Sequence, residues 1–158
     1  MSDDFHILLA VDLQYGMVQL LAEATRYGRA LNAIVDIVHV ALQDPDFIGY
    51  PKSDRTEKPT QEDMIRDSTA KELRSARRQT QAIGAKLRAS GVRIGQVLTV
   101  QGPFPATLLE HVRDLHSSLL IVGSHTHSAL HRLWYGDTIK DLTLRPPCAL
   151  LVVPIDSE

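Results

Sequence analysis

Short apolar runs alternate with helical patterns along most of this chain. The run from Phe5 to Val11 is almost continuously apolar, as expected of a parallel strand covered on both faces. Ile34 to Ala41 is a second such run and is rich in β-branched residues. Between them, apolar residues recur at alternating steps of four and three, which predicts a helix that ends at Asn32 in a left-handed cap. The predicted buried face consists of Met17, Leu21, Ala24, Gly28 and Leu31.

A long polar segment and a long helix follow. Gln43 to Pro59 contains three prolines and shows no periodicity, so we expect a surface loop that is either a lid or a flexible insertion. Thr60 is placed to cap the next helix, which Gly91 closes. The basic residues of this helix are expected to form a solvated face rather than a nucleic-acid surface. Its predicted buried stripe is Thr69, Leu73, Ala76, Thr80, Ile83 and Leu87, and its basic residues include Lys71, Arg74, Arg77 and Arg78.

The remaining third of the chain repeats the alternation. Strands are predicted at Ile94 to Val100, Leu119 to Val122 and Ala149 to Val153. A further helix is predicted around Trp134 to Leu144. The helix between the first two of these strands is expected to bury Leu108, Leu109, Val112 and Leu115.

This alternation predicts a single α/β domain over residues 1–158, with right-handed crossovers and helices on both faces of a five-stranded parallel sheet. Five strands wound in this way favour the flavodoxin-like order 3-2-1-4-5. In that order the carboxyl ends of strands one and four meet at the switch point, where open α/β sheets bind ligands.

Composition and charge are those of an ordinary soluble globular protein. The chain is 44% hydrophobic and 23% charged with a net charge of −2, so no attraction to nucleic acid or membranes is expected. We expect neither a signal peptide nor a membrane-spanning run. Its single cysteine, Cys148, is expected to be buried and inert and suits a reducing compartment. We therefore expect a cytoplasmic protein.

The candidate chemistry gathers in a glycine-bounded loop after the fourth strand. The strand stops at Gly123, and a polar loop leads to Gly136, an arrangement that brings backbone N–H groups to a phosphate. The spacing resembles the nucleotide motif of the universal stress protein family: Gly, two residues, Gly, nine residues, Gly and then Ser or Thr. Gly123 and Gly136 match the first and last glycines. Thr126 stands at the middle glycine, and Asp137 stands at the final hydroxyl residue.

The resemblance extends from Ile7 to Pro154 and implies a protein that helps cells survive growth arrest or stress. It implies that Asp12 lies against the adenosine part of bound ATP and that the backbone of Val40 contacts the adenine. Gly102 is matched by a glycine near the ribose and phosphates. From the residues alone, Asp12 is equally suited to cap a helix, and Gly102 is better interpreted as a turn glycine.

The phosphate end departs from the family pattern. Thr126 is poorly suited to the positive φ for which a glycine is used. Asp137 only accepts hydrogen bonds, whereas the family's Ser or Thr donates one to phosphate. Two like charges about 4 Å apart repel by on the order of 4 kcal/mol at a protein surface, about half of the binding free energy of a micromolar ligand, unless a cation bridges them. Thr138 could supply the hydroxyl if the register shifts.

Histidines crowd the same loop. When protonated, His125, His127 and His131 could offset Asp137 and hold a phosphate, which would make binding depend on pH near neutrality. His and carboxylate side chains also suit zinc, but no second pair stands at ligand spacing, and exposed histidines without a shared role are the simpler interpretation. We assign no metal ligands. His39, within the second strand, is expected to be a hydrogen-bonded core histidine.

Quaternary structure is also implied by the resemblance. Members of the family are usually homodimers, and in many the final strand pairs with its two-fold mate. An uncovered apolar edge strand is a liability that dimerisation removes. The strand residues expected to pair are Leu150, Leu151, Val152 and Val153.

Three functional hypotheses result, and none includes a catalytic residue because the common enzyme motifs are missing. The first is a non-catalytic, dimeric stress-response or regulatory protein with a degenerate nucleotide loop, which acts by binding an unknown protein partner. The second is a sensor of ATP or another adenine nucleotide, with Mg²⁺ and at most slow hydrolysis. The third, weaker, is a metal binder that uses the histidine loop. The sensor's site would be Asp12, Gly123, His125, Gly136 and Thr138.

Overall fold

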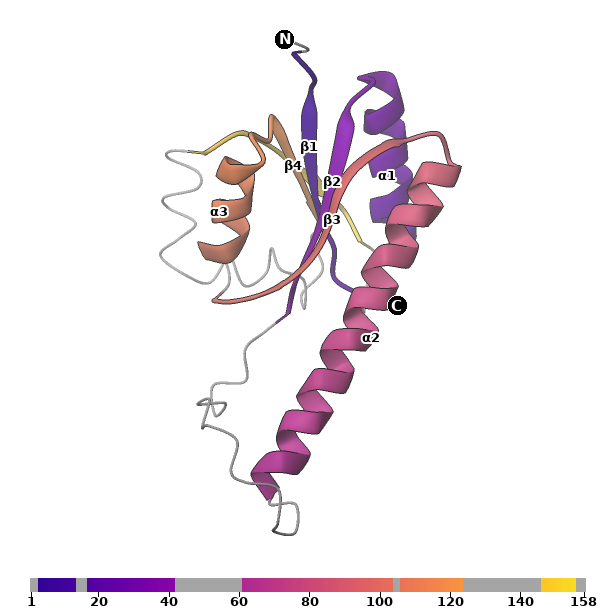
Figure 1. Cartoon of the computed structure of the whole chain (residues 1–158). Helices are drawn as coiled ribbons and strands as arrows, with labels where there is room; N and C mark the ends of the chain where they lie inside the picture. Colours follow the sequence, from indigo (N-terminus) through magenta and orange to yellow (C-terminus); the bar gives the residue numbers. More distant parts are fainter. Residues whose placement is uncertain (1–2, 14–16, 42–60, 104–105, 124–145, 156–158) are drawn as a thin grey trace.

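The five predicted strands form one parallel sheet with helices on both faces (Figure 1). This computed structural model describes residues 3–13, 17–41, 61–103, 106–123 and 146–155. The strand order is β3-β2-β1-β4-β5, which confirms the predicted 3-2-1-4-5 topology. The elements are β1 (His6–Ala10), α1 (Met17–Ala30), β2 (Ile34–Ala41), α2 (Gln61–Ala89), β3 (Arg93–Gln101), α3 (Ala106–Asp114), β4 (Leu119–Gly123) and β5 (Ala149–Val153).

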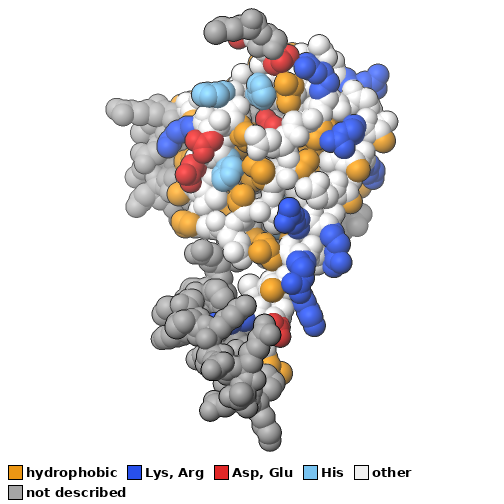
Figure 2. All heavy atoms as spheres, in the orientation of Figure 1, with side chains coloured by type: hydrophobic (Ala, Val, Ile, Leu, Met, Phe, Trp, Pro, Cys, Tyr) orange, Lys and Arg blue, Asp and Glu red, His pale blue; other side chains and the backbone are white. Residues whose placement is uncertain are grey.

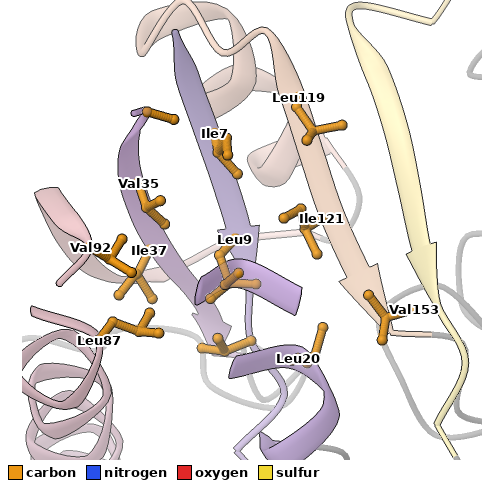
Figure 3. Packing of buried hydrophobic residues seen from close by; sticks show 13 residues of the cluster. Ile7, Leu9, Leu20, Val35, Ile37, Leu87, Val92, Leu119, Ile121 and Val153 are labelled. Carbon is orange, nitrogen blue, oxygen red and sulfur yellow. The ribbon is translucent and has the colours of Figure 1, made fainter. Parts of the chain in front are cut away.

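Alternate strand residues face opposite sides of the sheet, so the buried side chains form two clusters. The larger cluster lies on the side of α1 and α2, and Figure 3 shows Leu20 and Leu87 reaching it from these helices. The smaller cluster includes Leu108 and Val112 of α3. The strand residues of the larger cluster are Ile7, Leu9, Val35, Ile37, Leu119, Ile121 and Val153, and those of the smaller are Leu8, Ala10, Val38, Leu120 and Val122.

Helix α1 follows the predicted pattern except at Leu20, which is buried although it was not predicted to be, and at its end. Ala24 and Gly28 are buried, and a Cβ added at Gly28 would come within 3.1 Å of side-chain atoms of Val35 and Val92. The prediction was wrong for Leu31, which is 44% exposed. Leu31 lies just beyond the last helical residue, where the chain turns through Asn32 at a φ of 47°, so its side chain leaves the buried face. The left-handed cap at Asn32 is confirmed.

Helix α2 confirms its predicted stripe. Thr80 and Leu87 are buried, the other four stripe residues are half-buried, and Gly91 ends the helix region at a φ of 88°. In Figure 1 the first turns of α2 extend beyond the sheet. Lys and Arg side chains gather along this helix in Figure 2. The basic residues named above are all exposed, as expected of a solvated face.

Two predicted segments lie outside the described residues: the loop at Gln43 to Pro59, and the helix around Trp134 to Leu144. Within the described part of the chain, no helix is both long enough and apolar enough to cross a membrane.

Candidate nucleotide site at the carboxyl edge of the sheet

The carboxyl ends of β1 and β4 lie side by side. The two strands pair through Leu9 and Ile121, and two residues further along each strand stand Val11 and Gly123. The N–H of Val11 still donates to the carbonyl oxygen of Val38, at 3.0 Å, so the chain remains attached to β2 as it leaves β1. Asp12 follows directly and is half-buried. The topology therefore places Asp12 at the switch point, between the ends of β2 and β4.

Val40 reaches the same edge from β2. Ala10 is paired with Val38 across β1 and β2, so Val40 stands beyond the last residue of β1. The side chain of Val40 packs against the smaller core. On its other side, β2 pairs with β3, and there Val40 stands opposite Val100. The fold thus brings Asp12, Val40 and Gly123 to one edge of the sheet, from three separate strand ends.

The glycine at position 123 has a packing reason. A Cβ added to Gly123 would collide with Cδ1 of Ile155, which follows β5. Among the glycines in the described ranges, positive φ values occur at Gly91 and Gly102 and not here. Close approach of the C-terminal segment therefore accounts for Gly123 without a bound anion.

Gly102 also has a local explanation. A Cβ at this position would collide with the hydroxyl of Thr107 in the first turns of α3. That hydroxyl and the Thr107 N–H both donate to the Pro103 carbonyl oxygen, at 2.9 and 3.0 Å. Gly102 lets the turn close on the start of α3, which agrees with the interpretation of a turn glycine.

His39 ties the ends of β1 and β2 together. Its Nδ1 lies 3.0 Å from the carbonyl oxygen of Val11, and the residue is half-buried. A carbonyl oxygen only accepts, so Nδ1 carries the proton. The expected hydrogen bond is confirmed, but His39 is half-buried rather than a core residue. Thr99, paired with His39 across β2 and β3, has a buried hydroxyl without a hydrogen-bond partner among the residues described.

A buried carboxylate in β2 was missed by the sequence analysis. Asp36 is 2% exposed; its Oδ1 accepts the Gln96 N–H at 2.7 Å, and its Oδ2 lies 3.2 Å from Nδ1 of His6. The register between β2 and β3 shifts at this point, and a Cβ on Gly95 would collide with the carboxylate. The available signal was a single Asp within a β-branched run. Asp36 is paired with Leu8 in mid-strand, so it stands apart from the carboxyl edge.

The remaining predicted site residues lie outside the described residues: His125, Thr126, Gly136, Asp137 and Thr138, together with the other loop histidines. Among the residues that are described, no group of three or more His, Cys, Asp or Glu side chains could hold a metal ion. Cys148 is half-buried against the smaller core, and this burial raises the pKa of its thiol, partly offset by a hydrogen bond with the backbone of Leu120.

The sheet order and the converging strand ends are those of the universal stress protein class, and sequence comparison agrees. Residues 5–154 match the model of the Universal stress protein family, so the chain belongs to that family. No curated protein sequence gives a significant match.

Solved structures share the fold at low sequence identity. The universal stress protein UspA from Lactobacillus plantarum superimposes with a TM-score of 0.68 and 15% identity, covering 97% of this chain and 99% of that one. A universal stress protein in complex with cAMP gives a TM-score of 0.61 and 15% identity, covering 98% and 100%. The universal stress protein from Archaeoglobus fulgidus in complex with dAMP gives 0.52 and 18%, covering 96% and 98%.

Proposed function

We propose that this chain is a cytoplasmic, non-catalytic regulatory protein of the universal stress class that acts as a homodimer through other proteins. We further propose that its carboxyl edge accepts the adenosine part of an adenine nucleotide but disfavours a highly charged phosphate chain. The observation that carries the ligand proposal is the convergence of Asp12, Val40 and Gly123 at the switch point.

The adenosine half of the site has suitable chemistry. The Asp12 carboxylate can accept hydrogen bonds from ribose hydroxyls. Adenine presents an acceptor nitrogen next to its amino group, which suits the N–H and C=O of a strand end such as Val40. Related structures were solved with cAMP and with dAMP, which supports an adenine ligand.

The part of the proposed site that faces the phosphates would discriminate among nucleotides by their charge. In the alignment with the family motif, Asp137 takes the place of a hydroxyl that would donate to phosphate. A carboxylate there repels each added phosphate charge. A cyclic phosphodiester carries a single negative charge, so we expect cAMP to bind more tightly than AMP, and AMP more tightly than ATP.

Calorimetric titration with cAMP, AMP and ATP–Mg²⁺ at two pH values on either side of histidine titration tests this order. We expect Asp12→Asn to weaken all three ligands by about tenfold, the loss of one charged hydrogen bond. Asp137→Ser should increase the affinity for ATP more than the affinity for cAMP. Absence of heat with every ligand would contradict nucleotide binding, and phosphate release from ATP would contradict the non-catalytic assignment.

The homodimer is proposed on the exposure of β5. This strand is at the edge of the sheet, and Leu150 and Val152 are 44% and 38% exposed. Both point to the side opposite Val153, which is buried in the larger core. An apolar edge strand with free backbone groups is suited to pairing with a second copy.

A further inference from the structure

We propose that His39 is a positioning residue of the adenosine site. Its imidazole donates a hydrogen bond to the carbonyl oxygen of Val11, which ends the backbone hydrogen bonding between β1 and β2. The N–H of Val40 can then donate to the ligand. This inference rests on the proposed function, because it requires an adenine ligand at the carboxyl edge.

The first step is the point at which the ladder stops. The Val11 N–H donates to the carbonyl of Val38 at 3.0 Å. In an uninterrupted parallel ladder, the next bond would run from the N–H of Val40 back to the carbonyl of Val11. That bond is not among the backbone hydrogen bonds between these described residues. The carbonyl oxygen lies instead 3.0 Å from Nδ1 of His39.

The second step is the direction in which the polar groups point. Successive residues of a strand face opposite sides, so the His39 side chain lies on the side of α1 and α2 while that of Val40 packs against the smaller core. The amide of Val40 lies in the plane of the sheet. It is directed toward the β1 side, at a level that β1 no longer occupies, and this is the switch point beside Asp12.

The third step is chemical. The imidazole donates through Nδ1, so it satisfies the Val11 carbonyl without using the Val40 amide. That amide is then a donor for an acceptor nitrogen of adenine. Without the imidazole, the Val11 carbonyl would be free to accept from Val40, and the ladder would extend by one bond at the expense of the ligand contact.

Side-chain replacements separate these roles. His39→Leu removes the donor, whereas His39→Asn keeps an amide nitrogen near the place of Nδ1. His111→Leu is the matched control, because His111 makes the same kind of bond, from Nδ1 to the carbonyl of Thr107 at 2.8 Å, on α3. If His39→Leu does not fold, His39→Gln takes its place, since its amide lies near the position of Nε2.

Two measurements are made on each folded variant: calorimetric titration with cAMP, and amide hydrogen exchange of Val40 by NMR. In His39→Leu we expect the Kd for cAMP to rise about tenfold and exchange at Val40 to slow by a similar factor, the effect of one hydrogen bond. His39→Asn and His111→Leu should stay within about twofold of the parent, below the effect of one hydrogen bond.

The outcomes are distinguishable. Unchanged cAMP affinity or unchanged Val40 exchange in His39→Leu overturns the inference while leaving the proposed function intact. An equal loss in His39→Asn also overturns it, because the effect would then come from the packing of the ring. A parent protein that binds no adenine ligand overturns the proposed function and this ligand role together.

Discussion

Single side chains decide how β2 sits among its neighbours. Asp36 and His39 both lie on this strand, and each contacts a different neighbouring strand or strand end. Asp36 bonds the Gln96 amide across a register shift and holds β3 in place. His39 bonds the Val11 carbonyl and marks the end of β1. One strand thus carries a structural carboxylate in its middle and, near its end, the imidazole that we propose positions the ligand.

Replacing the buried carboxylate should be costly. Asp36→Leu leaves the N–H of Gln96 without its acceptor, and we expect a loss of about 1–3 kcal/mol in the free energy of unfolding. The free energy of unfolding is measured by urea titration, with circular dichroism as the signal. Asp67→Leu, an exposed carboxylate on α2, is the control and should change stability by less than about 0.5 kcal/mol. Equal effects of the two changes would contradict the structural role of Asp36.

The thiol of Cys148 should react slowly. Burial raises its pKa, so the thiolate that attacks alkylating reagents is scarcer at neutral pH than in an unstructured peptide. We expect the rate of iodoacetamide labelling to rise with pH at a higher midpoint than in the urea-unfolded protein. Stability should fall as pH rises through the unfolded thiol's pKa, because the unfolded chain loses its proton first. A midpoint below that of the unfolded chain would contradict this assignment.

At the scale of elements, helix ends govern how each helix meets the sheet. Just after helix α1, Asn32 adopts a left-handed backbone conformation. The next residue, Ala33, donates its N–H to the Gly28 carbonyl oxygen at 2.9 Å, and β2 begins directly after it. The side chain of Arg93 on β3 donates to the carbonyl of Asn32 at 2.9 Å. This turn therefore fixes α1 relative to two strands.

Changes at this turn test the role of its backbone conformation. Asn32→Val places a β-branched residue at positive φ and should cost about 1–2 kcal/mol. Asn32→Gly is the control; it keeps the conformation and should differ from the parent by less than about 1 kcal/mol. Both are measured by thermal unfolding, and both keep the main-chain carbonyl that Arg93 contacts. A valine variant as stable as the glycine variant would refute this account.

For the whole molecule, the strand order determines where the two proposed functional surfaces lie. Placing β1 between β2 and β4 gathers the predicted adenosine residues at the carboxyl edge. The same order leaves β5 at one edge of the sheet, where Leu150 and Val152 are exposed. Strand β4 therefore connects the proposed ligand site with the proposed dimer interface.

Charge on β5 should separate the dimer. We expect the double change Leu150→Lys and Val152→Lys to convert a dimer into a monomer, since two cations from each copy would face each other across the strand pair. Light scattering coupled to size-exclusion chromatography gives the mass. Val18→Lys, at a residue of α1 that is 79% exposed, is the control and should leave the mass unchanged. A monomeric parent would refute the proposed dimer.

Much of this protein followed from the sequence alone. The apolar runs located all five strands to within one residue at each end, and the helical stripes identified the buried faces of α2 and α3. These patterns are local, because an element must bury one face at its own period. The family resemblance was confirmed over residues 5–154.

Only the tertiary structure decided how residues distant in sequence meet. It paired Asp36 with Gln96, placed Ile155 against Gly123 and joined His39 to the Val11 carbonyl. No periodicity reports these contacts, because each depends on strand register and on the path of the chain after a strand ends. The sequence determined which segments form the sheet, and the packing of those segments determined which atoms meet at its carboxyl edge.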